Sequence, residues 1–239
     1  MDPNFRDIWV YLAASPLLHL TLTLIAYQAG FWLYRKANLN PLLNPVLIAV
    51  CILVAILFAT GTGYQTYFEG AQFVHFLLGP ATVSLAIPLY RKLETVKRSA
   101  GALLASVGLG SLTAALTAVL LVRVLGGSET TMISIAPKSV TAPVAMGISE
   151  QLGGLPSLTA VLVVMTGIFG AVFGPPLLNV LRIRDWRARG LAIGTASHGI
   201  GTARALQVNE VAGAFSGLAM GLNAVATAFL LPLVWRLLF

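Results

Sequence analysis

The chain has 239 residues, of which 57% are hydrophobic and 10% are charged, and its formal net charge is +7. Soluble domains carry roughly a quarter charged residues, and the mean hydropathy of +0.86 is far from that class. The composition therefore excludes an ordinary soluble domain and predicts an all-α polytopic membrane protein, with one domain over residues 1–239.

Apolar runs close to the ~20 residues that cross a bilayer recur along the whole chain, bounded by glycine and proline. They predict about eight membrane segments. The expected segments are 12–34, 43–60, 70–90, 101–125, 131–150, 157–178, 188–207 and 212–236.

The basic residues lie in the connectors between these segments, mainly at 35–36, 91–98 and 182–189. This distribution is typical of cytoplasmic loops and suits an anionic membrane surface. No basic stripe alternates with aromatic residues, so nucleic acid is not an expected partner. The single cysteine, Cys51, excludes a disulfide framework within the chain.

Two segments carry the same proline-centred polar break. PATVSLAI begins at Pro80 and PKSVTAPV begins at Pro137, each with hydroxyl residues at its third and fifth positions. Proline lacks a backbone N–H and interrupts a helix. Freed backbone groups are tolerated in lipid only where they line a cavity or a site. We therefore expect both segments to be broken or re-entrant, and a transporter-like solute pathway is the first hypothesis.

The basic loops place a further constraint on the segment 131–150. The loops at 91–98 and 182–189 should lie on the same side of the membrane, so an even number of crossings must separate them. Three predicted segments lie between them, and 131–150 is the most polar. We expect it to be re-entrant or split into two half-helices; the alternative is that one basic loop violates the rule.

Faint internal repeats pair Gly70-Ala71 and Pro88-Leu89 with Gly213-Ala214 and Pro232-Leu233. Such repeats occur in many secondary transporters, whose sites lie where broken helices of the two halves meet. The positions of the basic loops predict that segments 70–89 and 213–233 cross the membrane in the same direction. Inverted repeats would cross in opposite directions, so the sequence leaves the nature of the repeat open.

The breaks favour an anionic ligand. Half-helix N-termini present free N–H groups and a positive dipole end to a carboxylate. The hydroxyl groups beside the breaks can donate hydrogen bonds to it; they belong to Thr82, Ser84, Ser139 and Thr141. Lys138 can neutralise its charge. The alternatives are that Lys138 reaches an interface from a segment end and that the hydroxyls bond back to their own helix.

A second polar constellation is GTASHGIGTAR, residues 194–204, whose glycines permit close backbone approach or local unwinding. His198, with Ser197 and Thr202 beside it, can contact the substrate or carry a proton. Alternatively, it is a buried histidine that braces an unwound turn.

Three more polar residues have two readings each. Arg204 either contacts the substrate or anchors the segment at the interface. Asn44 and Asn223 are amides within apolar runs, which serve ligand contact or hydrogen-bonded helix packing equally well.

Five runs of this sequence resemble motifs of the LrgB family and follow one another in the same order as in that family. They are LLNPVLIA at 42–49, LLGPATVSLAIPLYR at 77–91, PKSVTAPVAMGISEQLGG at 137–154, ASHGIGTARAL at 196–206 and GAFSGLAMGL at 213–222. That family includes the LrgB and CidB proteins, described as holin/antiholin-like effectors of murein hydrolases, and the C-terminal part of the plastidic glycolate/glycerate translocator. The resemblance implies transport of short monocarboxylates such as glycolate, glycerate, lactate or pyruvate, and an LrgA-type small membrane protein as a partner.

We therefore expect a secondary transporter of short monocarboxylates that works by alternating access. A homodimer is expected by analogy with other broken-helix carriers. The alternative is a holin/antiholin-like protein that regulates murein hydrolases. We expect no enzyme activity, because HExxH, GxSxG and phosphate-loop motifs are missing, and no cofactor or metal. The short N-terminus favours a bacterial inner membrane.

Overall fold

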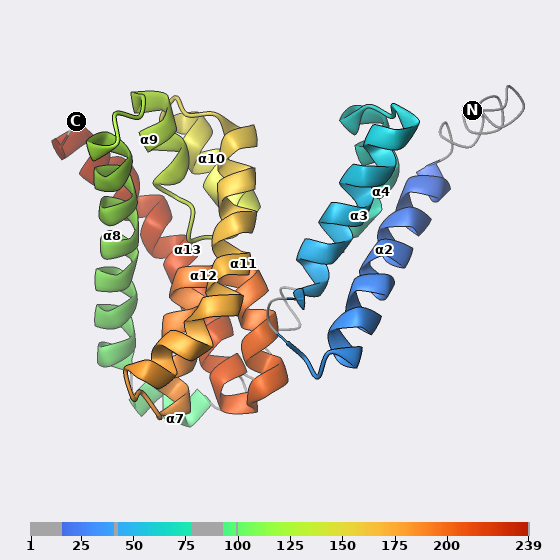
Figure 1. Ribbon diagram of the computed structural model, residues 1–239. Coiled ribbons are helices and arrows are strands. Elements are labelled where there is room, and N and C mark those ends of the chain that lie inside the picture. Colours follow the sequence, from blue (N-terminus) through green and yellow to red (C-terminus); the bar gives the residue numbers. More distant parts are fainter. Residues whose placement is uncertain (1–15, 41–42, 78–92, 99, 239) are drawn as a thin grey trace, which may run out of the picture. The chain divides into compact units, whose positions relative to one another are not determined.

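The computed structural model describes residues 16–40, 43–77, 93–98 and 100–238. The chain divides into two compact units, residues 1–84 and 85–239. Every regular element among the described residues is a helix, which confirms the all-α class (Figure 1).

Four helices in the described part are long and apolar enough to cross a membrane: Leu17–Lys36, Ala100–Val124, Pro156–Val180 and Glu210–Leu237. These helices make the chain a multi-pass membrane protein, as its composition predicts. The count of eight segments is not confirmed. The break at Pro80 lies outside the described residues, so it stays a prediction, as does the repeat that pairs 70–89 with 213–233.

The first unit contains α2 (Pro16–Lys36), α3 (Pro45–Thr60) and α4 (Tyr64–Phe76), with α2 packed against both others. Asn44 begins α3 by accepting a hydrogen bond from the backbone N–H of Val46 at 2.9 Å. Pro45 suits the first helical position because no N–H is needed there. Gly61, with a φ of 65°, ends the same helix in the left-handed region.

The second unit contains α7 (Leu93–Arg98), α8 (Ala100–Val124), α9 (Glu129–Ile135), α10 (Ala142–Gln151), α11 (Pro156–Val180), α12 (Trp186–Val208) and α13 (Glu210–Leu238). The long helices α8, α11 and α13 form its frame. In Figure 1, α7 lies at one end of this unit, and α9 and α10 lie at the opposite end together with the C-terminus.

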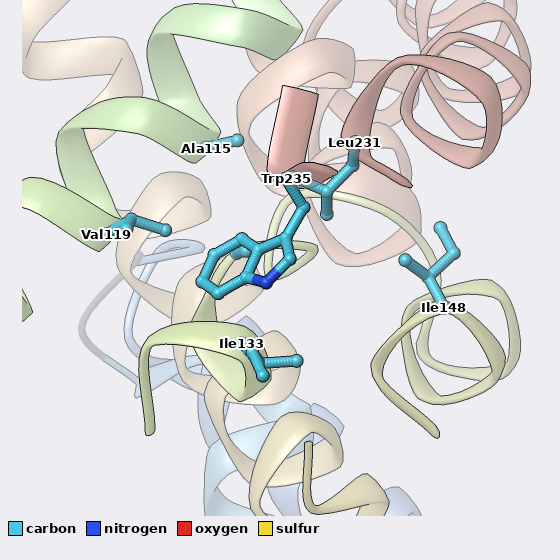
Figure 2. Close-up of a cluster of buried hydrophobic side chains, with 7 residues drawn as sticks. Ala115, Val119, Ile133, Ile148, Leu231 and Trp235 are labelled. Carbon is cyan, nitrogen blue, oxygen red and sulfur yellow. The ribbon is translucent and has the colours of Figure 1, made fainter. Parts of the chain in front are cut away.

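The short helices α9 and α10 form a re-entrant hairpin, called here the first hairpin (residues 129–151). Its two arms return to the same end, because Ile133 and Ile148 lie in one apolar cluster with Val119 of α8 and Trp235 of α13. Figure 2 shows the Trp235 indole among these side chains. The split expected in the segment 131–150 is confirmed, and residues 136–141 form the first tip.

The helix α12 also doubles back, and it is called here the second hairpin (residues 186–208). Its two arms meet at His198, whose φ of 40° and ψ of −134° are not helical. A Cβ atom on Gly201 would lie 2.9 Å from Cγ2 of Ile193, although eight residues of straight helix span about 12 Å. Both arms therefore lie on one side of the second tip, residues 195–199.

This reversal makes the prediction of a crossing at 188–207 wrong, while the local unwinding expected from its glycines is confirmed. The glycines allow close packing at both ends of α12. Gly190 lies against Ala212, and Gly213 lies against Leu206, so both ends of α12 meet the start of α13. The apolar character of the segment predicts a continuous helix. Instead, the chain turns at His198, which has a positive φ and is followed by Gly199.

The two hairpins enter the second unit from opposite ends. The first hairpin follows α8 and the second follows α11, which runs back in the other direction (Figure 1). Two crossings, α8 and α11, therefore separate α7 from the loop before α12. The even count of crossings that the positive-inside rule requires is met within the described part of this unit.

Candidate functional site

The two hairpin tips meet at the middle of α13, where Asn223 joins them. Its Nδ2 donates a hydrogen bond to the Ser139 carbonyl at 3.1 Å and another to the Thr195 carbonyl at 3.0 Å. Both partners are acceptors, so the orientation of the amide follows from the hydrogen-bond network. The Asn223 side chain is fully buried, and its Oδ1 has no hydrogen-bond partner among the described residues.

Lys138 brings a positive charge to the first tip. Its side chain is half-buried, and Nζ donates a hydrogen bond to Oγ of the buried Ser139 at 3.1 Å. Lys138 takes part in no ion pair with the described residues, whose salt bridges are Lys97–Glu94 and Arg187–Asp185. An ammonium group within a membrane segment is unfavourable without a partner, so this tip can attract an anion.

The N-terminus of α10 adds hydrogen-bond donors to the same tip. Thr141 is the N-cap residue, but its side chain makes no capping hydrogen bond. Pro143 then occupies the first turn, where a missing N–H costs little. The helix end therefore keeps uncapped donors and a positive dipole end, both of which favour an anion.

His198 braces the second tip. The ring is buried, and Nε2 donates a hydrogen bond to the Val163 carbonyl of α11 at 2.9 Å. Thr202 holds the turn from the other arm, because its Oγ1 donates to the His198 carbonyl at 2.8 Å and lies 2.9 Å from Oγ of Ser216. This geometry favours the bracing role for both residues.

Ser197 lies beside His198 and is fully buried. It packs against Gly170 of α11, where no larger residue would leave room for it. Its Oγ has no hydrogen-bond partner among the described residues. A buried hydroxyl without a partner is unfavourable, and because Oγ lies against Gly170 of α11 the structure does not direct Ser197 toward a ligand between the tips.

The remaining predicted site residues lie elsewhere or outside the described part. Arg204 lines a small pocket of about 40 Å³ with Trp186 and Arg189, near the ends of the second hairpin and away from its tip. Asn44 belongs to the first unit, where it caps α3. Thr82 and Ser84 lie among residues 78–92, which the structure does not describe.

A groove of about 350 Å³ leads along the second hairpin toward the tips. It runs between α8 and the first arm of α12, from Ala188 to Thr195, the residue whose carbonyl binds Asn223. The lining is formed by small side chains, a single leucine and two hydroxyls: Ser106, Gly110, Ala114, Ala188, Leu191, Ala192, Thr195 and Ala196.

A buried hydroxyl network fixes the first hairpin to α11. Oγ1 of Thr159 donates to the Ser134 carbonyl at 3.0 Å and lies 2.8 Å from Oγ of Ser149. The sequence did not predict this network, and it left Asn223 open between ligand contact and helix packing. The signal for Asn223 was present, since an amide in an apolar run requires a hydrogen-bond partner. In the described part of the chain, no cluster of acidic, histidine or cysteine residues can hold a metal ion.

Comparisons with known proteins agree on a family. The model of the LrgB-like family matches residues 23–237, which include parts of both units. The "Uncharacterized protein YxaC" of Bacillus subtilis is 37% identical over 222 residues, covering 93% of this chain and 96% of that protein. The "Holin-like protein CidB" of Staphylococcus epidermidis is 34% identical over 229 residues, covering 96% and 99%. That of Staphylococcus aureus (strain Mu50) is 34% identical over 223 residues, covering 93% and 97%.

No solved structure matches the chain significantly. The sequence comparisons nevertheless extend over nearly the full length, and they confirm the family that the five sequence runs indicate. The chain belongs to the LrgB-like family.

Proposed function

We propose that this protein is a secondary transporter for short monocarboxylates, with its binding site between the two hairpin tips. The observation that carries the proposal is Lys138. It is a half-buried ammonium group that forms no ion pair with the described residues, and it lies beside the uncapped N-terminus of α10. A carboxylate supplies the charge and the acceptors that these groups lack.

The hairpins also support alternating access. They enter the unit from opposite ends and meet at Asn223, so a ligand between them can be released toward either end if one hairpin moves. The groove from Ala188 to Thr195 supplies a route from the end at which the second hairpin enters. Among glycolate, glycerate, lactate and pyruvate, the residues favour no single substrate.

A second candidate function comes from the relatives. Two of the proteins compared above are named holin-like, and these names support a holin/antiholin-like membrane protein more directly than they support transport. In that function the chain regulates the activity or export of murein hydrolases. Polarity concentrated at two tips favours a localised site over a continuous pore lining, which is why we place the carrier first.

The sequence also leads to expectations about the membrane and the partners of this protein. We propose a homodimer in a bacterial inner membrane, an LrgA-type small membrane protein as a partner, and no enzyme activity. None of these parts is needed for the experiment that separates the two functions.

The experiment is uptake of radiolabelled glycolate, lactate and pyruvate into proteoliposomes, with release of a trapped dye measured in parallel. A carrier gives saturable uptake and no dye release. Lys138→Ala should lower the uptake at limiting substrate by about 10-fold to 100-fold, since a hydrogen bond to a charged group contributes about 1.5–3 kcal/mol. Lys97→Ala removes the same charge from the exposed helix α7 and should leave uptake unchanged.

Two results would contradict the carrier. Dye release that does not depend on Lys138 would favour the holin-like function. Uptake that is equally reduced by Lys97→Ala and Lys138→Ala would show that net charge, rather than the tip, governs the flux.

A further inference from the structure

Asn223 is the residue through which one side chain bonds both hairpins. Its two amide hydrogens go to one backbone carbonyl from each tip, Ser139 in the first and Thr195 in the second. The last carbonyls of a helix have no partner within that helix. Thr195 lies just before the break at His198, and Ser139 lies in the turn between α9 and α10, so Asn223 satisfies one backbone carbonyl at each break.

Packing alone does not explain an asparagine at this position. The side chain is fully buried, and Oδ1 has no hydrogen-bond partner among the described residues. A buried acceptor without a partner is unfavourable, and an apolar residue would avoid that cost. The advantage of asparagine lies in its two donors, which point to two different hairpins.

We propose that Asn223 is a positioning residue that couples the two tips, so that they open and close as one unit. Through this coupling, ligand binding at either tip changes the opening of the other tip. The role in transport rests on the proposed function, whereas the coupling itself is a property of the fold and can be measured without any substrate.

The test is hydrogen–deuterium exchange of the purified protein, followed in peptides that contain residues 136–142 and 194–200. Asn223→Ala should increase exchange by about tenfold or more in both peptides, because it removes both hydrogen bonds together. The matched control is Thr227→Val, one turn further along α13. It removes the buried hydrogen bond between Thr227 of α13 and Ser111 of α8, 2.8 Å long, in which no hairpin residue takes part. Both peptides should then exchange as in the wild type.

Asn223→Asp keeps the shape of the side chain and tests the donors alone. A protonated carboxyl can donate to one carbonyl, whereas an ionised carboxylate is repelled by both. Both tips should therefore be less protected than in the wild type at high pH, and on acidification the single O–H donor should restore protection in one of them. Lys138 and His198 are the titratable groups at the tips, so exchange is compared with the wild type at every pH.

Increased exchange in only one peptide after Asn223→Ala, or an equal increase after Thr227→Val, would overturn the coupling. Exchange in Asn223→Asp that follows the wild type at every pH would overturn it too. If Asn223→Ala does not fold, the Asn223→Asp series decides. If the wild type transports no carboxylate, the proposed function is wrong. The exchange measurements still test the coupling, because they need no substrate.

Discussion

Gly167 of α11 provides a sensitive test of how the second tip is held. A Cβ atom at this position would lie 2.7 Å from Cε1 and 2.9 Å from Nε2 of the His198 ring. Ordinary contact begins at 3.4 Å, so Gly167→Ala must displace the ring by about 0.7 Å. The hydrogen bond from Nε2 to Val163, now 2.9 Å long, then stretches beyond its useful range.

The energies of this change oppose one another. Overpacking costs about 1–3 kcal/mol, and a weakened buried hydrogen bond costs about as much, while alanine gains up to about 1 kcal/mol of helix propensity over glycine. We expect a net loss of about 2 kcal/mol, which lowers the midpoint of thermal unfolding by about 4–8 °C for a chain of this size. The assay is thermal unfolding of the purified protein in a mild detergent.

The control is Gly108→Ala in α8, where a Cβ atom meets nothing within 4 Å. This change should leave the midpoint unchanged or raise it by a few degrees. In a His198→Ala background the contact with the ring is absent and the contact with Cδ1 of Ile200, at 2.8 Å, remains. Gly167→Ala should then cost less than in the wild type, with an interaction energy of about 0.5–3 kcal/mol between the two sites. An equal effect of Gly167→Ala with and without the His198 ring would refute the reasoning.

Two further predictions concern the groove and the start of α12. In a Cys51→Ser background, Ala192→Cys in the groove should react with a charged thiol reagent, and glycolate should protect it. Val161→Cys, exposed on α11, should stay unreactive because we expect it to face lipid. Equal labelling of the two cysteines would contradict the proposed route along the groove. Hydrogen bonds from Arg187 lower the pKa of the Asp185 carboxyl from 3.8 to about 2. Its contribution to stability is therefore complete above pH 3.8 and lost as the pH falls through about 2, so the stability difference between the wild type and Asp185→Asn should stay constant from pH 8 to 5 and shrink below pH 4. A difference that changes between pH 8 and 5 would assign the effect to another group.

The sequence predicts the helical class and the first hairpin well, because both follow from strong local signals. Composition indicates membrane helices, and Pro137 with its hydroxyl neighbours indicates the break. The positive-inside rule then shows which segment cannot be a simple crossing. These arguments need no knowledge of the contacts between distant residues.

The second hairpin shows where sequence reasoning ends. Residues 186–208 have the length and much of the apolar character of a crossing, and their glycines indicate only that the backbone is free to bend. The reversal depends on contacts with other helices, such as Gly190 against Ala212 and the His198 ring against Val163. The same limit applies to Asn223, whose two partners come from segments far apart in the sequence.

The predicted site residues separate for a related reason. Lys138, Ser139 and Thr141 lie together because they are neighbours in one break, and His198 joins them because the second hairpin ends at the same depth. Arg204 shares a polar run with His198, but the helical arm between them carries it toward the end at which the hairpin enters. Closeness in sequence predicts closeness in space within a turn, and it already fails over these six residues, which span about 9 Å of helix.

The opposed entry of the hairpins sets a condition on any carrier mechanism for this fold. The first hairpin is held to α11 through Thr159, which contacts Ser134 and Ser149, and the second tip is held one turn further along the same helix by the bond of His198 to Val163. Both supports lie on α11, so this helix is a shared base against which either hairpin can move. If the proposed carrier operates, loosening one support should favour the state that opens toward that end. Thr159→Val and Gly167→Ala should therefore shift access in opposite directions, and a shift in the same direction would show that the hairpins do not act as opposed gates.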